Sequence, residues 1–404
     1  MKKIDEMIKQ LCPNGVEIVP LWSVTAWDKK FNAVDKSMQS KIIKYPYLLA
    51  KDLFALDTPE GSIKLLSTGT QSGWTTEEKA GNYLCDGEVV TIPWGKSSKV
   101  INLIKYYKGK FVTADNRIAT SLDKDILNNK YLFYWMLSES DVIDSYYRGA
   151  GIKHPSMYNV LTMQIPLPPL SIQKEIVSVL DKFSELIEKT DEEIALRQKQ
   201  YEYYREKLLT FEKGEVEEYE IQQCCVTQSG GTPSKRNTSF WENGDIKWLG
   251  STVCQNVSYI DTITDFITEE GLRHSSAKLL HSDTTLIALV GATIGKVAYL
   301  TFDSAINQNI VGIYSKETSV LMNKYIYYYS YLWYKDFMSL ANGKLAMASL
   351  SFVRQLKIKY PSLSRQQSIV ATLDKFETLI SKLKEERELR QKQYEYYREK
   401  LLTF

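Results

Sequence analysis

The chain has 404 residues, of which 44% are hydrophobic and 25% charged, so it can bury two or three ordinary cores and is neither disordered nor fibrous in composition. The formal net charge of +2 excludes an overall basic field for nucleic acid or membranes, so any polyanion site must be a local patch. Five cysteines without a CxxC pair, together with only three histidines, indicate a reducing compartment and no structural metal.

Residues 1–15 predict a short N-terminal helical stub that ends at Pro13-Asn14-Gly15. This start has basic residues but no continuous apolar core before a small-residue cleavage site. No later run approaches the length of a membrane span. We therefore expect a soluble, cytoplasmic protein.

Residues 16–165 and 215–360 predict two domains of mixed strands and short helices, because Tyr, Trp and β-branched runs alternate with Gly and Asn turns. The two sequences differ strongly, but Asn116 lies 193 residues before Asn309, and residues 94–100 resemble residues 291–297. A constant frame with variable faces would suit a reader of two different half-sites. Neutral drift around a structural frame explains the pattern equally well.

Each domain is followed by a predicted long helix, at residues 170–213 and 363–404, without an internal Gly or Pro. Residues 196–211 recur unchanged as residues 389–404, an offset of 193. Both helices carry a heptad seam in the same phase, and about 40 residues of helix span on the order of 60 Å. The first seam is Ile176, Leu180, Phe183, Ile187, Thr190, Ile194, Arg197, Tyr201, Tyr204, Leu208 and Phe211.

Helices with matching seams can pair, and the order domain, helix, domain, helix favours antiparallel pairing. A core helix inside an ordinary enzyme is the alternative for a single such helix, but duplication in phase favours a coiled coil. The predicted fold class is therefore α+β, with two globular domains in a pseudo-twofold arrangement joined by two long helices that form an antiparallel coiled coil.

Known catalytic motifs are not found in the sequence. The segment GATIGKV at residues 291–297 has three residues between its glycines and no Ser or Thr after Lys296, so it fails the phosphate-loop pattern. There is no GxGxxG after a strand, no HExxH, no Asn-Pro-Pro-aromatic element for amino-methyl transfer and no paired-carboxylate nuclease cluster. The acidic run at residues 191–193 lies on the predicted coil, where a solvated face explains it. These observations argue against a self-contained enzyme.

The second domain opens with Gly230-Gly231-Thr232-Pro233-Ser234 and continues with FWENGDIKWL at residues 240–249. With GATIGKV, the NQN element at residues 307–309 and the helix openings LSIQ and LSRQ, it resembles target-recognition domains of type I restriction-modification specificity subunits. The resemblance covers essentially the whole chain. The first domain lacks the GGTPS start and has VPLW at residues 19–22 and KKF at residues 29–31 instead. It shares residues 68–70, 96–100, 110–111 and 115–116 with related domains.

The resemblance implies a non-catalytic subunit that reads a bipartite, asymmetric double-stranded DNA target. Each domain would read one half-site, and the coiled coil would measure the nonspecific gap. It also implies two methyltransferase (modification) subunits and restriction/translocase subunits as partners. S-adenosylmethionine, ATP and Mg would belong to these partners, with no cofactor on this chain.

Candidate DNA-binding residues follow from side-chain chemistry, since Lys and Arg bind phosphates or guanine edges and Asn pairs with adenine. They are Lys96, Lys99, Asn116, Arg117, Thr232, Ser234, Lys235, Arg236, Lys296 and Asn309. For Asn116 and Asn309 a turn or capping role stays equally open, and Trp241 and Trp248 are expected to be core anchors. The tyrosine-rich helix ends exceed the needs of a two-helix seam, which predicts a coiled-coil and partner interface. Its residues are Tyr201, Tyr203, Tyr204, Leu208, Tyr394, Tyr396, Tyr397 and Leu401.

Two other functions remain open from the residues alone. A coiled-coil scaffold with two protein-binding domains would explain the repeat without DNA, and the salt-dependent DNA affinity of the isolated chain would discriminate it. A self-contained DNA methyltransferase or nuclease would require S-adenosylmethionine binding or DNA cleavage by this chain alone.

Overall fold

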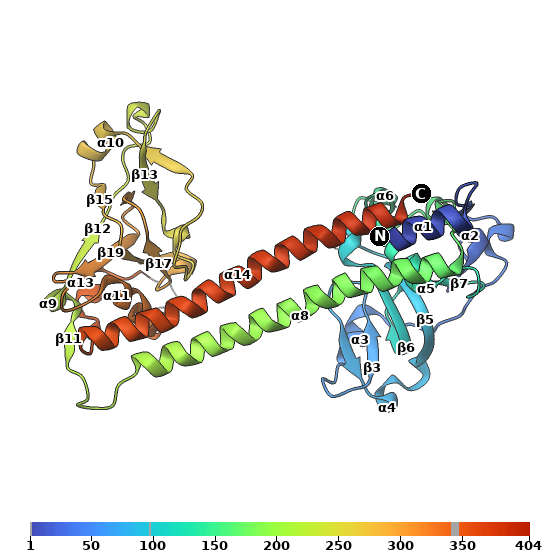
Figure 1. Cartoon of the computed structure of the whole chain (residues 1–404), viewed down its shortest axis with the longest axis horizontal. Helices are drawn as coiled ribbons and strands as arrows, with labels where there is room; N and C mark the ends of the chain where they lie inside the picture. The colour runs from blue at the N-terminus through green and yellow to red at the C-terminus, as the bar shows by residue number, and fades with distance from the viewer. Residues whose placement is uncertain (1, 97, 341–346) are drawn as a thin grey trace. The chain divides into compact units, whose positions relative to one another are not determined.

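A computed structural model of the chain describes residues 2–96, 98–340 and 347–404, so Ser97 of the 94–100 segment lies outside the described residues. The chain divides into two compact units: unit 1 comprises Met1–Lys189 and Arg387–Phe404, and unit 2 comprises Thr190–Glu386. Two helices of 40 residues, α8 (Leu170–Leu209) and α14 (Leu363–Leu402), each contribute one part to each unit (Figure 1).

Unit 1 is built on a mixed sheet with the strand order β2-β7-β5-β6-β3-β4, in which β3 and β6 run parallel. Helix α5 is buried along most of its length, and Asn128 caps it by accepting hydrogen bonds from the N–H groups of Lys130 and Tyr131. The hydrophobic core joins the sheet, α5 and the unit 1 parts of α8 and α14. The strands are β1 (Ile18–Pro20), β2 (Thr25–Trp27), β3 (Ile63–Leu66), β4 (Gly73–Thr75), β5 (Cys85–Pro93), β6 (Lys105–Thr113), β7 (Asn116–Ser121), β8 (Tyr147–Arg148), β9 (His154–Pro155) and β10 (Gln164–Pro166). The helices are α1 (Lys2–Leu11), α2 (Leu21–Val24), α3 (Ala50–Ala55), α4 (Glu77–Ala80), α5 (Asn129–Ser138), α6 (Ser140–Ser145) and α7 (Met157–Leu161).

Where unit 1 has one six-stranded sheet, unit 2 has two four-stranded sheets, with the strand orders β12-β19-β16-β17 and β14-β13-β18-β15. Its larger core includes α11 and the unit 2 parts of α8 and α14. The strands are β11 (Glu218–Glu220), β12 (Cys225–Ser229), β13 (Ile246–Leu249), β14 (Asp265–Ile267), β15 (Lys278–Leu280), β16 (Thr284–Ala288), β17 (Val297–Leu300), β18 (Ser304–Ile306), β19 (Ile310–Ser315) and β20 (Lys357–Lys359). The helices are α9 (Ile221–Cys224), α10 (Glu269–Arg273), α11 (Asn323–Ser330), α12 (Tyr334–Ser339) and α13 (Leu350–Gln355).

The two long helices pack antiparallel inside each unit. In unit 1 the ring of Phe183 stacks on Tyr397 with 5.1 Å between centroids, while Leu186, further along α8, accepts a hydrogen bond from Arg390, which is earlier on α14. In unit 2 Tyr204 stacks on Phe376 at 5.5 Å. Aromatic and apolar residues of the heptad seam therefore make these contacts, as the sequence predicts. The expected α+β fold with two paired long helices is confirmed.

A buried glutamine near the start of each long helix holds the globular part of its unit. Gln173 accepts a hydrogen bond from the N–H of Asn128 at 2.9 Å and donates to the carbonyls of Ile126 and Pro168 at 2.8 Å. Gln366 makes the same three bonds in unit 2, at 2.9, 2.8 and 2.8 Å, with the residues that precede α11 and α14. Both glutamines are 0% exposed, so every polar atom of the side chain is needed.

A second repeated set lies on α5 and α11, which begin with Asn-Lys-Tyr and carry another Tyr three residues later. Tyr134 donates to Asp181 of α8 at 2.5 Å, and Lys130 pairs with the same carboxylate at 2.8 Å. In unit 2 Tyr328 donates to Asp374 at 2.5 Å, and Lys324 lies 3.9 Å from it. We call each of these two sets a helix dock. The dock of unit 1 consists of Gln173 and Asp181 with Lys130 and Tyr134 of α5. The dock of unit 2 consists of Gln366 and Asp374 with Lys324 and Tyr328 of α11. The dock orients each globular part against its long helices.

Candidate nucleic-acid interface

The GGTPS segment of unit 2 is held close to the backbone of β18. A Cβ atom at Gly230 would lie 1.8 Å from the carbonyl oxygen of Ile306, and one at Gly231 would lie 2.0 Å from Ser276 Oγ. The N–H of Gly231 also donates to the Ile306 carbonyl at 2.9 Å. Only glycine permits such an approach, so both glycines fix the path of the following loop.

The two tryptophans predicted as core anchors, Trp241 and Trp248, bind the backbone of this loop through their indole N–H groups. The indole N–H of Trp248 donates to the Gly231 carbonyl at 3.0 Å, and that of Trp241 donates to the Ser234 carbonyl at 3.2 Å. Their rings meet edge to face at 5.3 Å. Thr232 then donates to Gln308 Oε1 at 2.7 Å, which ties the loop to the NQN element.

Ser234, Lys235 and Arg236 follow directly and are exposed. The ammonium of Lys235 lies 6.0 Å from the centre of the Trp241 ring. The anchored loop therefore presents two cations and a hydroxyl to solvent, the donor types that bind a phosphate backbone.

The backbones of Lys296 and Asn309 both bond to the end of β16. GATIGKV forms the connection between β16 and β17, with Gly291 and Gly295 at φ values of 70° and 72°. The N–H of Ala288 donates to the Lys296 carbonyl at 3.0 Å, and that of the next residue donates to the Asn309 carbonyl at 2.8 Å. The Lys296 ammonium donates to Gln255 at 3.3 Å. The backbone of each residue is thus bonded to the end of β16, and both residues are half-buried.

The unit 1 candidates divide by exposure. Lys99 is exposed. Lys96 has a side chain only 14% exposed, pairs with Asp144 and lies over the Tyr147 ring at 5.2 Å. Asp144 also accepts the N–H of Val100, so it fixes the described part of the 94–100 segment at two points.

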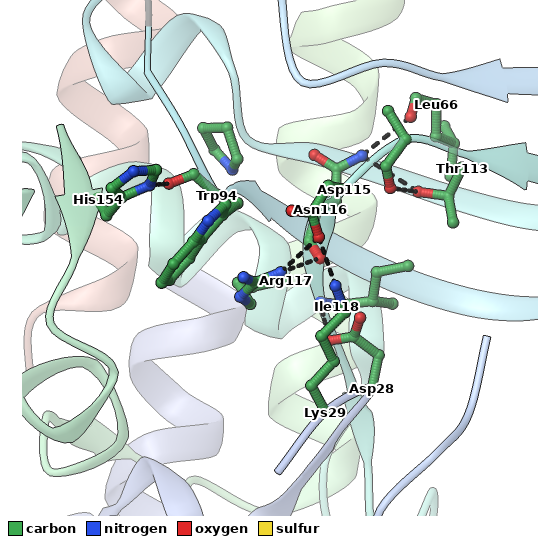
Figure 2. Close-up of polar contacts among 12 residues, drawn as sticks. Asp28, Lys29, Leu66, Trp94, Thr113, Asp115, Asn116, Arg117, Ile118 and His154 are labelled. Atoms are coloured by element: carbon green, nitrogen blue, oxygen red, sulfur yellow. Dashed lines mark hydrogen bonds and ion pairs between the residues drawn. The ribbon is translucent and has the colours of Figure 1, made fainter. Parts of the chain in front are cut away.

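Asn116 and Arg117 are 1% and 5% exposed. The Arg117 guanidinium pairs with Asp115 at 2.9 Å and lies 3.8 Å over the ring of Trp94, which stacks on His154 at 4.5 Å (Figure 2). Asn116 donates to the Leu66 carbonyl at 2.9 Å. In this conformation both side chains bind the protein itself and neither reaches solvent, so their contact with DNA remains a prediction.

Two carboxylates next to this cluster have shifted pKa values. Burial raises the pKa of Asp28 to about 6, although the N–H of Ile118 and the charges of Arg117 and Lys29 act in the opposite direction. Burial also acts to raise the pKa of Asp115, but hydrogen bonds from Lys29 and Arg117 outweigh it and hold that pKa below the ordinary value. Sequence reasoning missed Asp28, because no local pattern marks a buried acid after a three-residue strand.

The predicted coiled-coil and partner residues separate into an inner and an outer set. Tyr394 and Leu401 are buried, Leu208 is half-buried, and Tyr201 donates to Glu377 at 2.8 Å. Tyr204 and Tyr397 stack on the facing helix. Tyr203 and Tyr396 are 58% and 56% exposed, so their rings are available to another molecule.

Some classes of site are not present among the described residues. Within residues 2–96, 98–340 and 347–404, no group of three or more His, Cys, Asp or Glu side chains is arranged to hold a metal ion. None of the described helices combines the length and apolar character needed to cross a lipid bilayer.

Comparison with known proteins identifies the family. The model of the type I restriction modification DNA specificity domain matches residues 41–196 and 213–391. The chain is 35% identical over 305 residues to the type I restriction enzyme EcoR124I/EcoR124II specificity subunit of Escherichia coli, covering 71% of this chain and 74% of that one. A putative specificity subunit of Haemophilus influenzae is 32% identical over 80% of this chain and 84% of its own length. The crystal structure of a type I S subunit from M. genitalium shares the fold, with a TM-score of 0.63, 17% identity and 97% of both chains covered. The chain therefore belongs to the type I restriction-modification DNA specificity family.

Proposed function

We propose that this chain is the non-catalytic, cytoplasmic DNA-specificity subunit of a type I restriction-modification system. It reads a bipartite, asymmetric double-stranded target, with one half-site for each globular domain and the gap measured by the coiled coil. The observation that carries the proposal is the repeated helix dock, which holds two globular parts of different sequence in the same way. Constant orientation with different surfaces is what recognition of two unlike half-sites requires.

The DNA contacts proposed for unit 2 centre on the anchored loop. Lys235 and Arg236 bind phosphates, Thr232 and Ser234 add hydroxyl donors, and Lys296 and Asn309 complete the site from the end of β16. In unit 1 the exposed Lys99 binds phosphate, while Lys96, Asn116 and Arg117 fix the segments around it. This division follows burial, because a cation already paired inside the protein releases few counterions from DNA.

The chemistry resides on partner subunits in this proposal. Two methyltransferase subunits supply S-adenosylmethionine binding, and restriction/translocase subunits supply ATP and Mg. The outer tyrosines Tyr203 and Tyr396 form part of the surface that methyltransferase subunits bind. Their identical surroundings in the repeated 16 residues suit two copies of one partner.

The decisive experiment is to co-express the chain with its partner methyltransferase and map genomic N6-methyladenine by single-molecule sequencing. A bipartite methylated motif is expected. If a stable complex with a demonstrably active partner methylates no motif, the scaffold hypothesis replaces this one.

The contacts are tested by salt-dependent DNA binding of the assembled complex. Lys235→Ala and Arg236→Ala should each weaken binding and reduce the slope of log K against log salt by about one. Lys213→Ala removes an exposed charge outside the proposed interface and should leave the slope unchanged. Equal effects of all three substitutions would refute the assigned contacts.

A further inference from the structure

A turn at residues 67–72 of unit 1, between β3 and β4, is held by a lysine from another strand. The ammonium of Lys105 in β6 donates to the carbonyls of Ser67 and Gly69, the latter at 2.6 Å, and lies 3.2 Å from Ser67 Oγ. Ser67 in turn donates to the carbonyls of Gly69 and Gln71. We call residues 67–72 the reading turn.

Asn116 reaches the same turn from β7. Its amide donates to the carbonyl of Leu66 at 2.9 Å and lies 3.4 Å from that of Ser67. The carbonyls at the start of the reading turn therefore point into the protein, toward an amide and an ammonium. The side chains of Thr70, Gln71 and Ser72 are exposed.

Burial of the Lys105 ammonium disfavours its charged form. Burial, followed by the nearby charge of Lys64, lowers the pKa of Lys105 to about 8. A half-buried cation that is bonded to carbonyls rather than to a carboxylate serves to fix the backbone. The neighbouring Lys108 of β6 is exposed.

Unit 2 has a counterpart with a different length. Strand β13, like β3, pairs antiparallel with the strand that follows it and parallel with a later one. The helices that come next both start with Thr-Glu-Glu, with Thr76 and Thr268 as the capping side chains. Between these matched flanks, unit 1 has residues 67–72 and unit 2 has residues 250–264. The two units thus diverge in one connection while its frame is kept.

We propose that the reading turn determines the bases accepted in the half-site of unit 1, with Thr70 and Gln71 facing DNA and with Lys105 and Asn116 as positioning residues. The 250–264 loop correspondingly determines the bases accepted in the half-site of unit 2. This proposal rests on the proposed function, because it assigns specificity within a DNA site. Exposed hydroxyl and amide groups on a fixed backbone are suitable donors and acceptors for base edges.

The test uses the complete complex with its methyltransferase partner, and the methylated motif is the readout. Gln71→Ala and Lys105→Met should each relax base preference about tenfold at positions of one half-site only. The other half-site reports on the same molecules and should keep its stringency. Lys108→Met removes an equal charge from the same strand and should leave both half-sites unchanged.

Loss of folding cannot imitate this result, since it lowers methylation at every site alike. If Lys105→Met does not fold, Thr70→Ala and Gln71→Ala still test the exposed side chains. Unchanged stringency in both half-sites for these variants overturns the proposal while the bipartite motif, and with it the proposed function, stands. A wild-type complex that methylates no bipartite motif overturns both.

Discussion

Asp28 should destabilise unit 1 at neutral pH, and Asp28→Asn should relieve the cost. The carboxyl is 6% exposed and accepts the N–H of Ile118 at 2.9 Å. An asparagine side chain can accept the same hydrogen bond through its oxygen without carrying a charge. The substitution therefore keeps the contact and removes the buried anion.

The magnitude follows from the pKa of Asp28, which is about 6 in the folded chain against an ordinary value of 3.8. Each pH unit between the two values is worth about 1.4 kcal/mol, so ionised Asp28 costs the folded chain about 3 kcal/mol above pH 6. Because the folded pKa is raised, the favourable contribution is complete below pH 3.8 and is lost as the pH rises through 6. Asp28→Asn should be more stable than wild type by about 3 kcal/mol at pH 8 and nearly equal to it near pH 4.

Urea unfolding of both proteins across this pH range measures the difference, in which other titrating groups cancel. The signal of unit 1 must be followed by itself, since two units can unfold separately. The expected gain at pH 8 corresponds to a melting temperature about 10 °C higher. An Asp28→Asn variant that is less stable than wild type at pH 8, or a difference that does not change with pH, would refute the reasoning.

Five further substitutions, grouped in three tests, examine the frame and the partner surface. Gln173→Ala and Gln366→Ala should each cost about 2–4 kcal/mol in urea unfolding, because buried partners lose their hydrogen bonds, and two very different costs would contradict a repeated dock. Gly230→Ala should destabilise unit 2 by about 3 kcal/mol or more, since its Cβ would lie 1.8 Å from a carbonyl oxygen; an unchanged unfolding midpoint would show that the loop can move. Tyr203→Ala and Tyr396→Ala should change stability by less than about 0.5 kcal/mol yet weaken methyltransferase capture in a pull-down, and undiminished capture would remove both residues from the interface.

The sequence predicts the long helices and their pairing because periodicity and duplication are local signals. The heptad seam predicts that Phe183 and Tyr397 lie on the contact faces of their helices, and the structure shows that the two rings stack on each other. The offset of 193 also relates Gln173 to Gln366 and Asp181 to Asp374, but their partners on α5 and α11 were missed. Lys130 and Lys324 are 194 residues apart, so a search at the single offset of 193 passes over them.

The site was only partly predictable, because burial is a tertiary property. The exposed Lys235 and Arg236 follow a recognisable GGTPS motif whose geometry is local. Arg117 is also a basic residue, but its guanidinium lies over the ring of Trp94 and pairs with Asp115, so it is buried. Lys105 lies in a strand rich in lysine that reads as solvent-facing, and its carbonyl partners are 36 and 38 residues away in sequence.

Because of the helix docks, substitutions in this chain fall into two classes with different structural effects. Substitutions in exposed connections change what a globular part can bind and leave its orientation alone. A substitution at Asp181 or Asp374 would instead disturb every contact surface of its unit at once. A foreign domain joined to these helices would have to supply the lysine and the tyrosine that bond to Asp181 or Asp374, together with the backbone groups that bond to Gln173 or Gln366. New specificities can therefore arise by replacement of whole parts, without redesign of the assembly that carries them.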